Sequence, residues 1–285
     1  MDLPKLHSIT KKIFVALVGG FLLVFLLFHM TANLLILRHD GGEWYSAFCH
    51  FMGTNLLVKI AEIGLLGFIA LHILLTMWLA VTNRLARPVR YHQRSRTKTH
   101  TGSKLMIWTG ILIFACIAIH FYDFYLVKTG LVKGQYMVKT ENLSKAIIER
   151  ENANNMLNEL EIEDLSAIFN HTLPNGRWDA SIEVIHQLNS QDKETLERLL
   201  PGSDPEPDFY YQAREKFSHL HIVIGYLVFF FILFFHLSHA FPSVFQSLGL
   251  NNYKYNPIIE VLGKIYTWII VLGFACVPIL VYLGL

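Results

Sequence analysis

Long runs of apolar residues dominate the hydropathy pattern of this 285-residue chain. A membrane-spanning α-helix needs about 20 mostly apolar residues, because each residue adds about 1.5 Å toward crossing a hydrocarbon core of about 30 Å. Runs of this length lie near Ile13–Leu37, Leu56–Val81, Leu105–Val127, Phe217–Phe241 and Ile258–Leu285. The pattern therefore predicts an all-α integral membrane protein with five transmembrane helices that form one bundle. The first run is longer than the apolar core of a cleaved signal peptide, so we expect it to be retained.

A long polar segment separates the third apolar run from the fourth. Residues Lys128–Lys216 hold ten basic and sixteen acidic residues, a net charge of −6. Within this segment, Asn142–Phe169 has apolar residues at helical spacing among charges, which predicts surface helices. The breaker-rich run Pro201–Pro207 predicts a turn before the chain returns to the membrane. The expected organisation is transmembrane helices 1–3 in residues 1–127, a partly helical extracytoplasmic insert in 128–214, and helices 4–5 in 215–285.

Basic residues in the short connections predict the orientation in the membrane. They gather before the first run and in the second connection: Lys5, Lys11, Lys12, Arg84, Arg87, Arg90, Arg94, Arg96, Lys98 and Lys104. Lys and Arg in short loops are retained on the cytoplasmic side, whereas long segments cross regardless of their charge. We therefore expect a cytoplasmic N-terminus, an extracytoplasmic insert and an extracytoplasmic C-terminus.

The composition agrees with a membrane protein and excludes several other classes. Only 16% of residues are charged and 53% are hydrophobic, whereas a soluble domain has about 25% charged residues. The net charge of +2 provides no field that would attract nucleic acid. The three cysteines are far apart, so they predict neither a disulfide framework nor a CxxC metal site. The unusual feature is histidine, with fourteen copies in so apolar a chain.

Four of these histidines fall inside four different apolar runs, and two of them share one depth. His29 follows Lys12 by 17 residues, about 25 Å along a helix. His120 follows Lys104 by 16 residues, about 24 Å along a helix. Because both helices start from the cytoplasmic side, this spacing places His29 and His120 together in an outer layer.

The other two intramembrane histidines lie nearer the cytoplasmic side. His72 precedes Arg84 by 12 residues, about 18 Å from the inner end of its helix. His236 follows Lys216, at an outer end, by 20 residues, which places it deep toward the cytoplasm. His72 and His236 therefore form a second, inner layer in this prediction.

Two facing imidazoles at one depth are the axial ligands that six-coordinate haem iron requires. Two such layers predict two stacked haems and an electron path across much of the bilayer. The simpler interpretation of any single intramembrane histidine is a hydrogen bond to a neighbouring helix. A proton-coupled transporter without redox function would also use membrane histidines. A histidine-box di-iron enzyme would need many more ligands near one surface.

The order and spacing of several short motifs resemble a known family. The motifs are FHMTAN at Phe28–Asn33, CHFMGTN at Cys49–Asn55, LHI at Leu71–Ile73, NRLAR at Asn83–Arg87, IHF at Ile119–Phe121, and FHLSH through FQSLG at Phe235–Gly249. In this order they resemble the cytochrome b (b558-type) membrane anchor subunit of succinate:quinone oxidoreductases. The resemblance is to the five-span, two-haem class that includes fumarate reductases, and it covers about residues 1–127 and 215–285.

The resemblance implies two haem b groups, with His29 and His120 as ligands of the distal iron and His72 and His236 as ligands of the proximal iron. It implies a bacterial cytoplasmic membrane protein that anchors a flavoprotein with FAD and an iron–sulfur subunit on the cytoplasmic face. Electrons from succinate would then reach a quinone, with menaquinone favoured over ubiquinone. A dihaem anchor of a hydrogenase or a formate dehydrogenase is the alternative within the same chemistry.

The fourth run departs from the family in two respects. Some relatives have a glutamate two residues before the fourth-run ligand, where this chain has Phe234, and this difference argues against compensating proton transfer across the membrane. Pro242 is expected to end or kink the helix shortly after the ligand. His239 is an alternative ligand to His236, or a hydrogen-bond donor to a haem propionate.

Quinone reduction needs proton donors beside an apolar slot. Glu62 in the outer part of the second run is one candidate, because burying a carboxylate in the bilayer has a high free-energy cost. The competing interpretation is that Glu62 forms an ion pair with Lys59 at the membrane interface. His50 in the first outer connection is another candidate for the quinone site. The basic connection Arg84–Lys104 is explained by the orientation rule, and it is also the expected contact with the iron–sulfur subunit.

Overall fold

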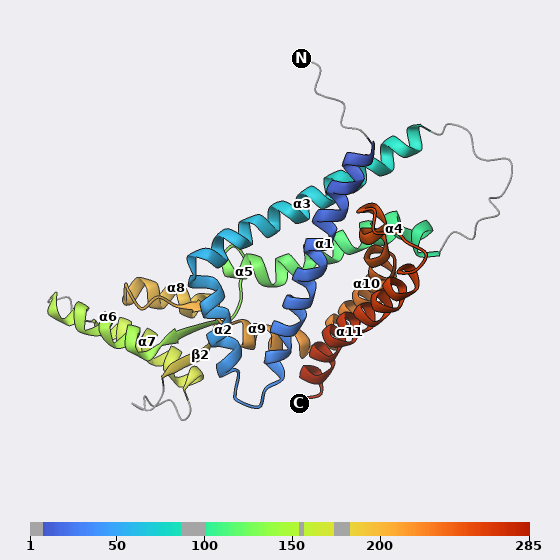
Figure 1. Cartoon of the computed structure of the whole chain (residues 1–285). Coiled ribbons are helices and arrows are strands. Elements are labelled where there is room, and N and C mark those ends of the chain that lie inside the picture. Colours follow the sequence, from blue (N-terminus) through green and yellow to red (C-terminus); the bar gives the residue numbers. More distant parts are fainter. Residues whose placement is uncertain (1–7, 87–100, 154–156, 174–182) are drawn as a thin grey trace, which may run out of the picture. The chain divides into compact units, whose positions relative to one another are not determined.

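The computed structural model of the chain describes residues 8–86, 101–153, 157–173 and 183–285. Within these ranges, five helices are long and apolar enough to cross a membrane (Figure 1). They occupy Ile9–Leu37, Leu56–Leu85, Leu105–Lys128, Leu220–Ser247 and Asn256–Tyr282. The chain is therefore a largely helical multi-pass membrane protein, and each span matches one of the predicted apolar runs.

The chain divides into two compact units, residues 1–116 with 219–285 and residues 117–218. The first unit contains α1 (Ser8–Asn33), η1 (Leu34–Leu37), α2 (Glu43–Thr54), α3 (Leu56–Leu85), most of α4 (Thr101–His120), α10 (Leu220–Ser247) and α11 (Asn256–Tyr282). The last four residues of α4 belong to the second unit, so the third span is shared between the two units.

Helix α1 is central to the first unit, because it packs against α3, α10 and α11. Helices α10 and α11 lie side by side and form the largest helix pair (orange and red in Figure 1). The hydroxyl of Tyr266 on α11 donates to the carbonyl of Leu23 on α1 at 2.6 Å. A β-carbon at Gly273 would overlap the buried Met30 side chain, so this glycine lets α11 approach α1 closely. No residue of α3 is buried, as expected where an apolar helix surface faces lipid.

Pro242 does not end the fourth span, contrary to one expectation from the sequence. Helix α10 continues through Pro242 to Ser247. Proline removes one backbone N–H, but spanning helices tolerate this loss because neighbouring groups satisfy the freed carbonyl. The family-like run Phe235–Gly249 therefore lies on one continuous helix as far as Ser247.

The second unit combines helices with a small sheet. Its elements are η2 (Phe121–Tyr125), α5 (Leu126–Lys128), β1 (Tyr136–Lys139), α6 (Thr140–Asn152), α7 (Glu159–Thr172), β2 (Val184–Leu188), α8 (Ser190–Leu199), β3 (Glu206–Pro207) and α9 (Phe209–Phe217). The strands pair in the order β2-β1-β3, and both pairings are antiparallel. Helices α6 and α7 lie where helical periodicity predicts them, whereas the hydropathy pattern did not predict the sheet.

The insert has a hydrophobic core of its own. Tyr136 and Val138 of β1 and Ile185 and Leu188 of β2 are almost completely buried. The core also contains apolar residues of the surrounding helices and turns: Leu143, Ala146, Leu165, Ile168, Leu173, Leu196, Leu199 and Leu200. The i, i+3 and i, i+4 spacing of these helical residues places them on one face of each helix, which is why the helices cover the sheet.

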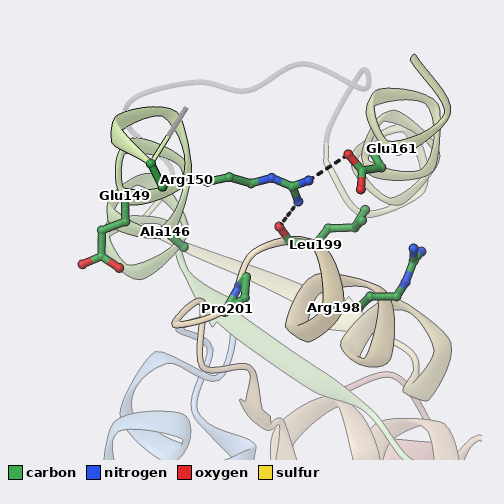
Figure 2. A pocket seen from close by; sticks show the side chains of 8 residues that line it. Ala146, Glu149, Arg150, Glu161, Arg198, Leu199 and Pro201 are labelled. Atoms are coloured by element: carbon green, nitrogen blue, oxygen red, sulfur yellow. Dashed lines mark hydrogen bonds and ion pairs between the residues drawn. The ribbon is translucent and has the colours of Figure 1, made fainter. Parts of the chain in front are cut away.

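A cavity of about 310 Å³ lies among α6, α7 and the end of α8 (Figure 2). The guanidinium of Arg150 donates to a carboxylate oxygen of Glu161 at 2.8 Å and to the carbonyl of Leu199. Glu161 also accepts from the backbone N–H of Asn158 at 3.0 Å, and it thereby completes a capping box at the start of α7. These contacts join three helices of the insert.

Candidate functional site

The four predicted haem ligands lie on four different spanning helices. His29 is on α1, His72 on α3, His120 at the end of α4, and His236 on α10. All four side chains are half-buried. The first unit contains His29, His72 and His236, and the second unit contains His120.

The structure brings the two inner histidines together. The rings of His72 and His236 are close enough for the charge of one to act on the other, although they belong to α3 and α10. The depth calculation places both residues in the inner layer, and their pairing stays a prediction.

A threonine on α4 sets the hydrogen bonding of His236. The hydroxyl of Thr109 lies 3.2 Å from Nδ1 of His236. The same hydroxyl lies 3.1 Å from the carbonyl oxygen of Met106, which has no proton to give, so the hydroxyl donates to that carbonyl. The hydroxyl oxygen is then free to accept a proton from Nδ1, which leaves Nε2 of His236 unprotonated. An unprotonated Nε2 is the form of histidine that binds iron.

Two glycines face the inner pair of rings. A β-carbon at Gly19 of α1 would lie 3.8 Å from Cε1 of His72, and one at Gly110 of α4 would lie 3.8 Å from Cε1 of His236. Because neither glycine has a side chain, the backbones of α1 and α4 approach these rings closely.

His72 also has an unused ring nitrogen. Its Nδ1 is buried and has no hydrogen-bond partner among the described atoms. Buried polar atoms are rarely left unsatisfied, so such an atom indicates a ligand, an ion or a water molecule. The chemistry of the pair, two imidazoles from different spans with Thr109 on one ring and an unpartnered nitrogen on the other, is of the kind that could hold a haem.

His29 has a different hydrogen-bonding environment. The amide nitrogen of Asn33 donates to the carbonyl of His29 at 2.7 Å and lies 3.3 Å from its Nδ1. The rings of Phe25 and Phe274 lie 5.2 and 5.7 Å from the imidazole, centre to centre. A donor at Nδ1 places the ring proton on Nε2, so iron binding through Nε2 requires Asn33 to turn its amide oxygen toward the ring.

His120 is the last residue of α4 before the chain changes its helical form. The five-residue π-helix η2 follows at once. The ring of Phe124 lies 5.1 Å from the imidazole of His120, centre to centre. The pairing of His120 with His29 stays a prediction.

The remaining candidates occupy separate elements. His239 lies on α10, half-buried and within electrostatic reach of His236. Glu62 is half-buried on α3, and His50 is half-buried on α2. The basic connection contains Arg90 and Arg94, which lie outside the described residues. In the described ranges, no three or more His, Cys, Asp or Glu side chains gather in a way that could hold a metal ion, so a multi-ligand centre of the di-iron kind is not formed there.

Sequence reasoning missed two residues of this site, Thr109 and Asn33. The only signal for Thr109 was its position next to Gly110, because a threonine in an apolar helix usually bonds to its own backbone. Asn33 was visible as the last residue of a family-like motif, but nothing in the sequence indicated that it contacts the ring of His29.

Comparisons with protein-family models, with curated proteins and with solved structures each returned no match.

Proposed function

We propose that the chain is the dihaem cytochrome b membrane anchor of a succinate:quinone oxidoreductase. It would pass electrons between a cytoplasmic iron–sulfur subunit and a membrane quinone. The observation that carries the proposal is the inner pair of histidines. His72 and His236 come from different spans, lie near one another, and each has a glycine beside its ring.

The residues of the chain have distinct roles in this proposal. Imidazole nitrogens of His72 and His236 would hold the inner haem iron, and the contact with Thr109 would fix the tautomer and orientation of His236. The apolar side chains of the spans exclude water from this pair. A bound haem would supply one-electron transfer, and its potential is set by the ligands, the hydrogen bonds and the burial around it.

The spacing along the helices supports a second layer. His29 follows Gly19 by ten residues on α1, and His120 follows Gly110 by ten residues on α4. Ten residues of α-helix correspond to about 15 Å. On both helices, the outer histidine thus lies the same distance along the helix axis from the glycine that is beside an inner ring.

The quinone half-reaction needs protons at the outer level. Glu62 on α3 and His50 on α2 are the residues we propose to exchange them, because both are half-buried ionisable groups in the first unit. His239 would hydrogen-bond a propionate of the inner haem rather than bind its iron. The flavoprotein and the iron–sulfur subunit would bind the cytoplasmic face, where the basic connection between the second and third spans is expected.

The test is the haem and partner content of the complex, purified in mild detergent from a host that expresses all its subunits. The proposal predicts two b-type haems per chain by the pyridine haemochrome assay. It also predicts co-purification of an FAD-containing subunit and succinate-dependent reduction of a menaquinone analogue. A hydrogenase or formate dehydrogenase anchor would retain the haems and lack the succinate activity, and a chain without haem would refute the proposal.

His221→Ala is the matched control for the ligand variants. His221 is on α10, like His236, but its ring lies against His219 near the outer end of the helix. We expect the His221→Ala protein to keep both haems, whereas the His236→Ala protein loses the inner one.

A further inference from the structure

The third span does not continue as a regular α-helix after His120. Residues Phe121–Tyr125 form the π-helix η2, and the short helix α5 follows. A π-turn inserts one residue relative to an α-helix, and such turns are rare and concentrated at functional sites. One inserted residue changes the direction of the following side chains by about 100°. Something must stabilise this form here in place of the α-helix.

A buried glutamine on α9 supplies a hydrogen bond to the π-helix. Gln212 is only 1% exposed. Its amide nitrogen donates to the backbone carbonyl of Asp123 at 2.9 Å, and its amide oxygen accepts from the backbone N–H of Gln135 at 3.0 Å. The Gln212 side chain thus joins η2 to the segment that leads into β1. A buried carbonyl without its helical partner needs such a donor.

An ion pair reinforces the same contact. The ammonium of Lys216 lies 3.0 Å from a carboxylate oxygen of Asp123, and both side chains are largely buried. Lys216 follows Gln212 by one helical turn on α9, so both residues act from the same face. The carboxylate of Asp123 is also close enough to act electrostatically on the ring of His120.

We propose that Gln212 and Lys216 form a clamp on the π-helix that positions His120 and balances the charge beside it. This role rests on the proposed function, in which His120 binds the outer haem. In this proposal the insert stabilises the outer end of the third span, because the clamp residues lie on α9, the last helix of the insert. Gln212 and Lys216 are positioning residues that act through Asp123.

The charge balance predicts shifts of opposite sign in the potential of the outer haem. Asp123→Asn removes a negative charge near the ring, and the reduction potential should rise. Lys216→Gln removes a positive charge beside that carboxylate, and the potential should fall. A swapped pair, Asp123→Lys with Lys216→Asp, should restore the geometry of the π-helix but not the original charge distribution. A merely structural contact would not produce shifts of opposite sign.

Gln212→Leu tests the clamp without changing any charge. Leucine has a similar volume and no donor, so the amides of residues 121–128 should lose protection in hydrogen–deuterium exchange of the purified complex. The low-field EPR signal of the outer haem should shift with this loss. Arg214→Ala is the control on α9, because Arg214 lies over the ring of Tyr210, and no change is expected there.

The outcomes separate the clamp from the proposed function. Opposite potential shifts, increased exchange in Gln212→Leu and partial recovery in the swapped pair would support the clamp. Two haems in the wild type with unchanged potential and EPR signal in the variants would overturn the clamp alone, even if exchange increases. A wild type without haem would overturn the proposed function and the ligand-positioning role together.

Discussion

At the scale of single residues, the inner histidine pair is defined as much by its neighbours as by its rings. Thr109 accepts from one ring, and glycines lie beside both rings. None of these neighbours is chemically unusual in a membrane helix, where threonine and glycine are common. Their meaning comes from their position against His72 and His236, which only the structure shows.

Thr109→Val removes the acceptor for Nδ1 of His236 and keeps the shape of the side chain. A ligand that donates a hydrogen bond is more basic and stabilises the oxidised iron. Loss of the bond should raise the potential of the inner haem on the order of 40 mV, equivalent to about 1 kcal/mol for one electron. A redox titration of both haems measures the shift. Thr82→Val is the control, since Thr82 bonds only to its own helix at the carbonyls of Trp78 and Leu79.

Gly110→Leu fills the space beside His236. Alanine at this position makes an ordinary contact with the ring, 3.8 Å from its Cβ to Cε1, so Gly110→Ala should keep the inner haem. The larger side chain of Gly110→Leu would overpack this site at a cost of about 1–3 kcal/mol, which corresponds to roughly 5- to 150-fold weaker haem binding. Haem content per chain is the measurement. Gly225→Leu on α10 should have no effect, because a β-carbon there meets nothing within 4 Å, and equal losses from both variants would contradict this account.

At the scale of elements, the spans were predictable and the insert was predictable only in part. Each spanning helix must satisfy its own backbone hydrogen bonds and cover them with apolar side chains, so its signal is long and continuous. The strands of the insert are two to five residues long, and one of them contains Gln187 at a φ of 62°. Strands this short leave no alternating pattern that distinguishes them from loops.

The π-helix and the continuation of α10 past Pro242 could also not be predicted from the sequence. The π-helix accepts a hydrogen bond from Gln212, which is 89 positions from Asp123 in the chain. Proline in a spanning helix has different consequences in different packings. Both features are decided by contacts between elements, and local patterns carry no information about such contacts.

Glu161 makes the stability of the insert dependent on pH. The backbone N–H of Asn158 and the guanidinium of Arg150 hold the pKa of this carboxyl below its ordinary value of 4.5. A lowered folded-state pKa contributes stability that is present above the unfolded pKa and is lost as pH falls through the folded pKa. The protection of the α6 and α7 amides, relative to the intrinsic exchange rate at each pH, should therefore be constant from about pH 7 down to 4.5, the value for an unperturbed glutamate, and should fall below it.

Glu161→Gln should remove part of this dependence. The amide keeps the shape and loses the charge, so the protection of the α6 and α7 amides should already be lower near neutral pH and should change less on acidification. Glu163→Gln is the control, because Glu163 is exposed on the same helix. An unchanged pH profile in Glu161→Gln would show that the contacts in Figure 2 do not stabilise the insert.

At the scale of the whole molecule, the chain has five apolar helices and an insert with its own core. The sequence predicted this architecture because lipid imposes the length of each span and because charge is concentrated between the third and fourth spans. It also predicted that His72 and His236 share a level, and this stays a prediction. The family resemblance, the outer pair and the quinone site stay predictions.

The most direct test of the central claim is which haem disappears from two single variants. His72→Ala and His236→Ala are purified as complexes, and the remaining haem is characterised by redox titration and EPR. The account predicts that both variants keep one and the same haem, the one that His120→Ala loses. Loss of different haems from His72→Ala and His236→Ala would contradict the pairing of these two histidines, and with it the account of the site.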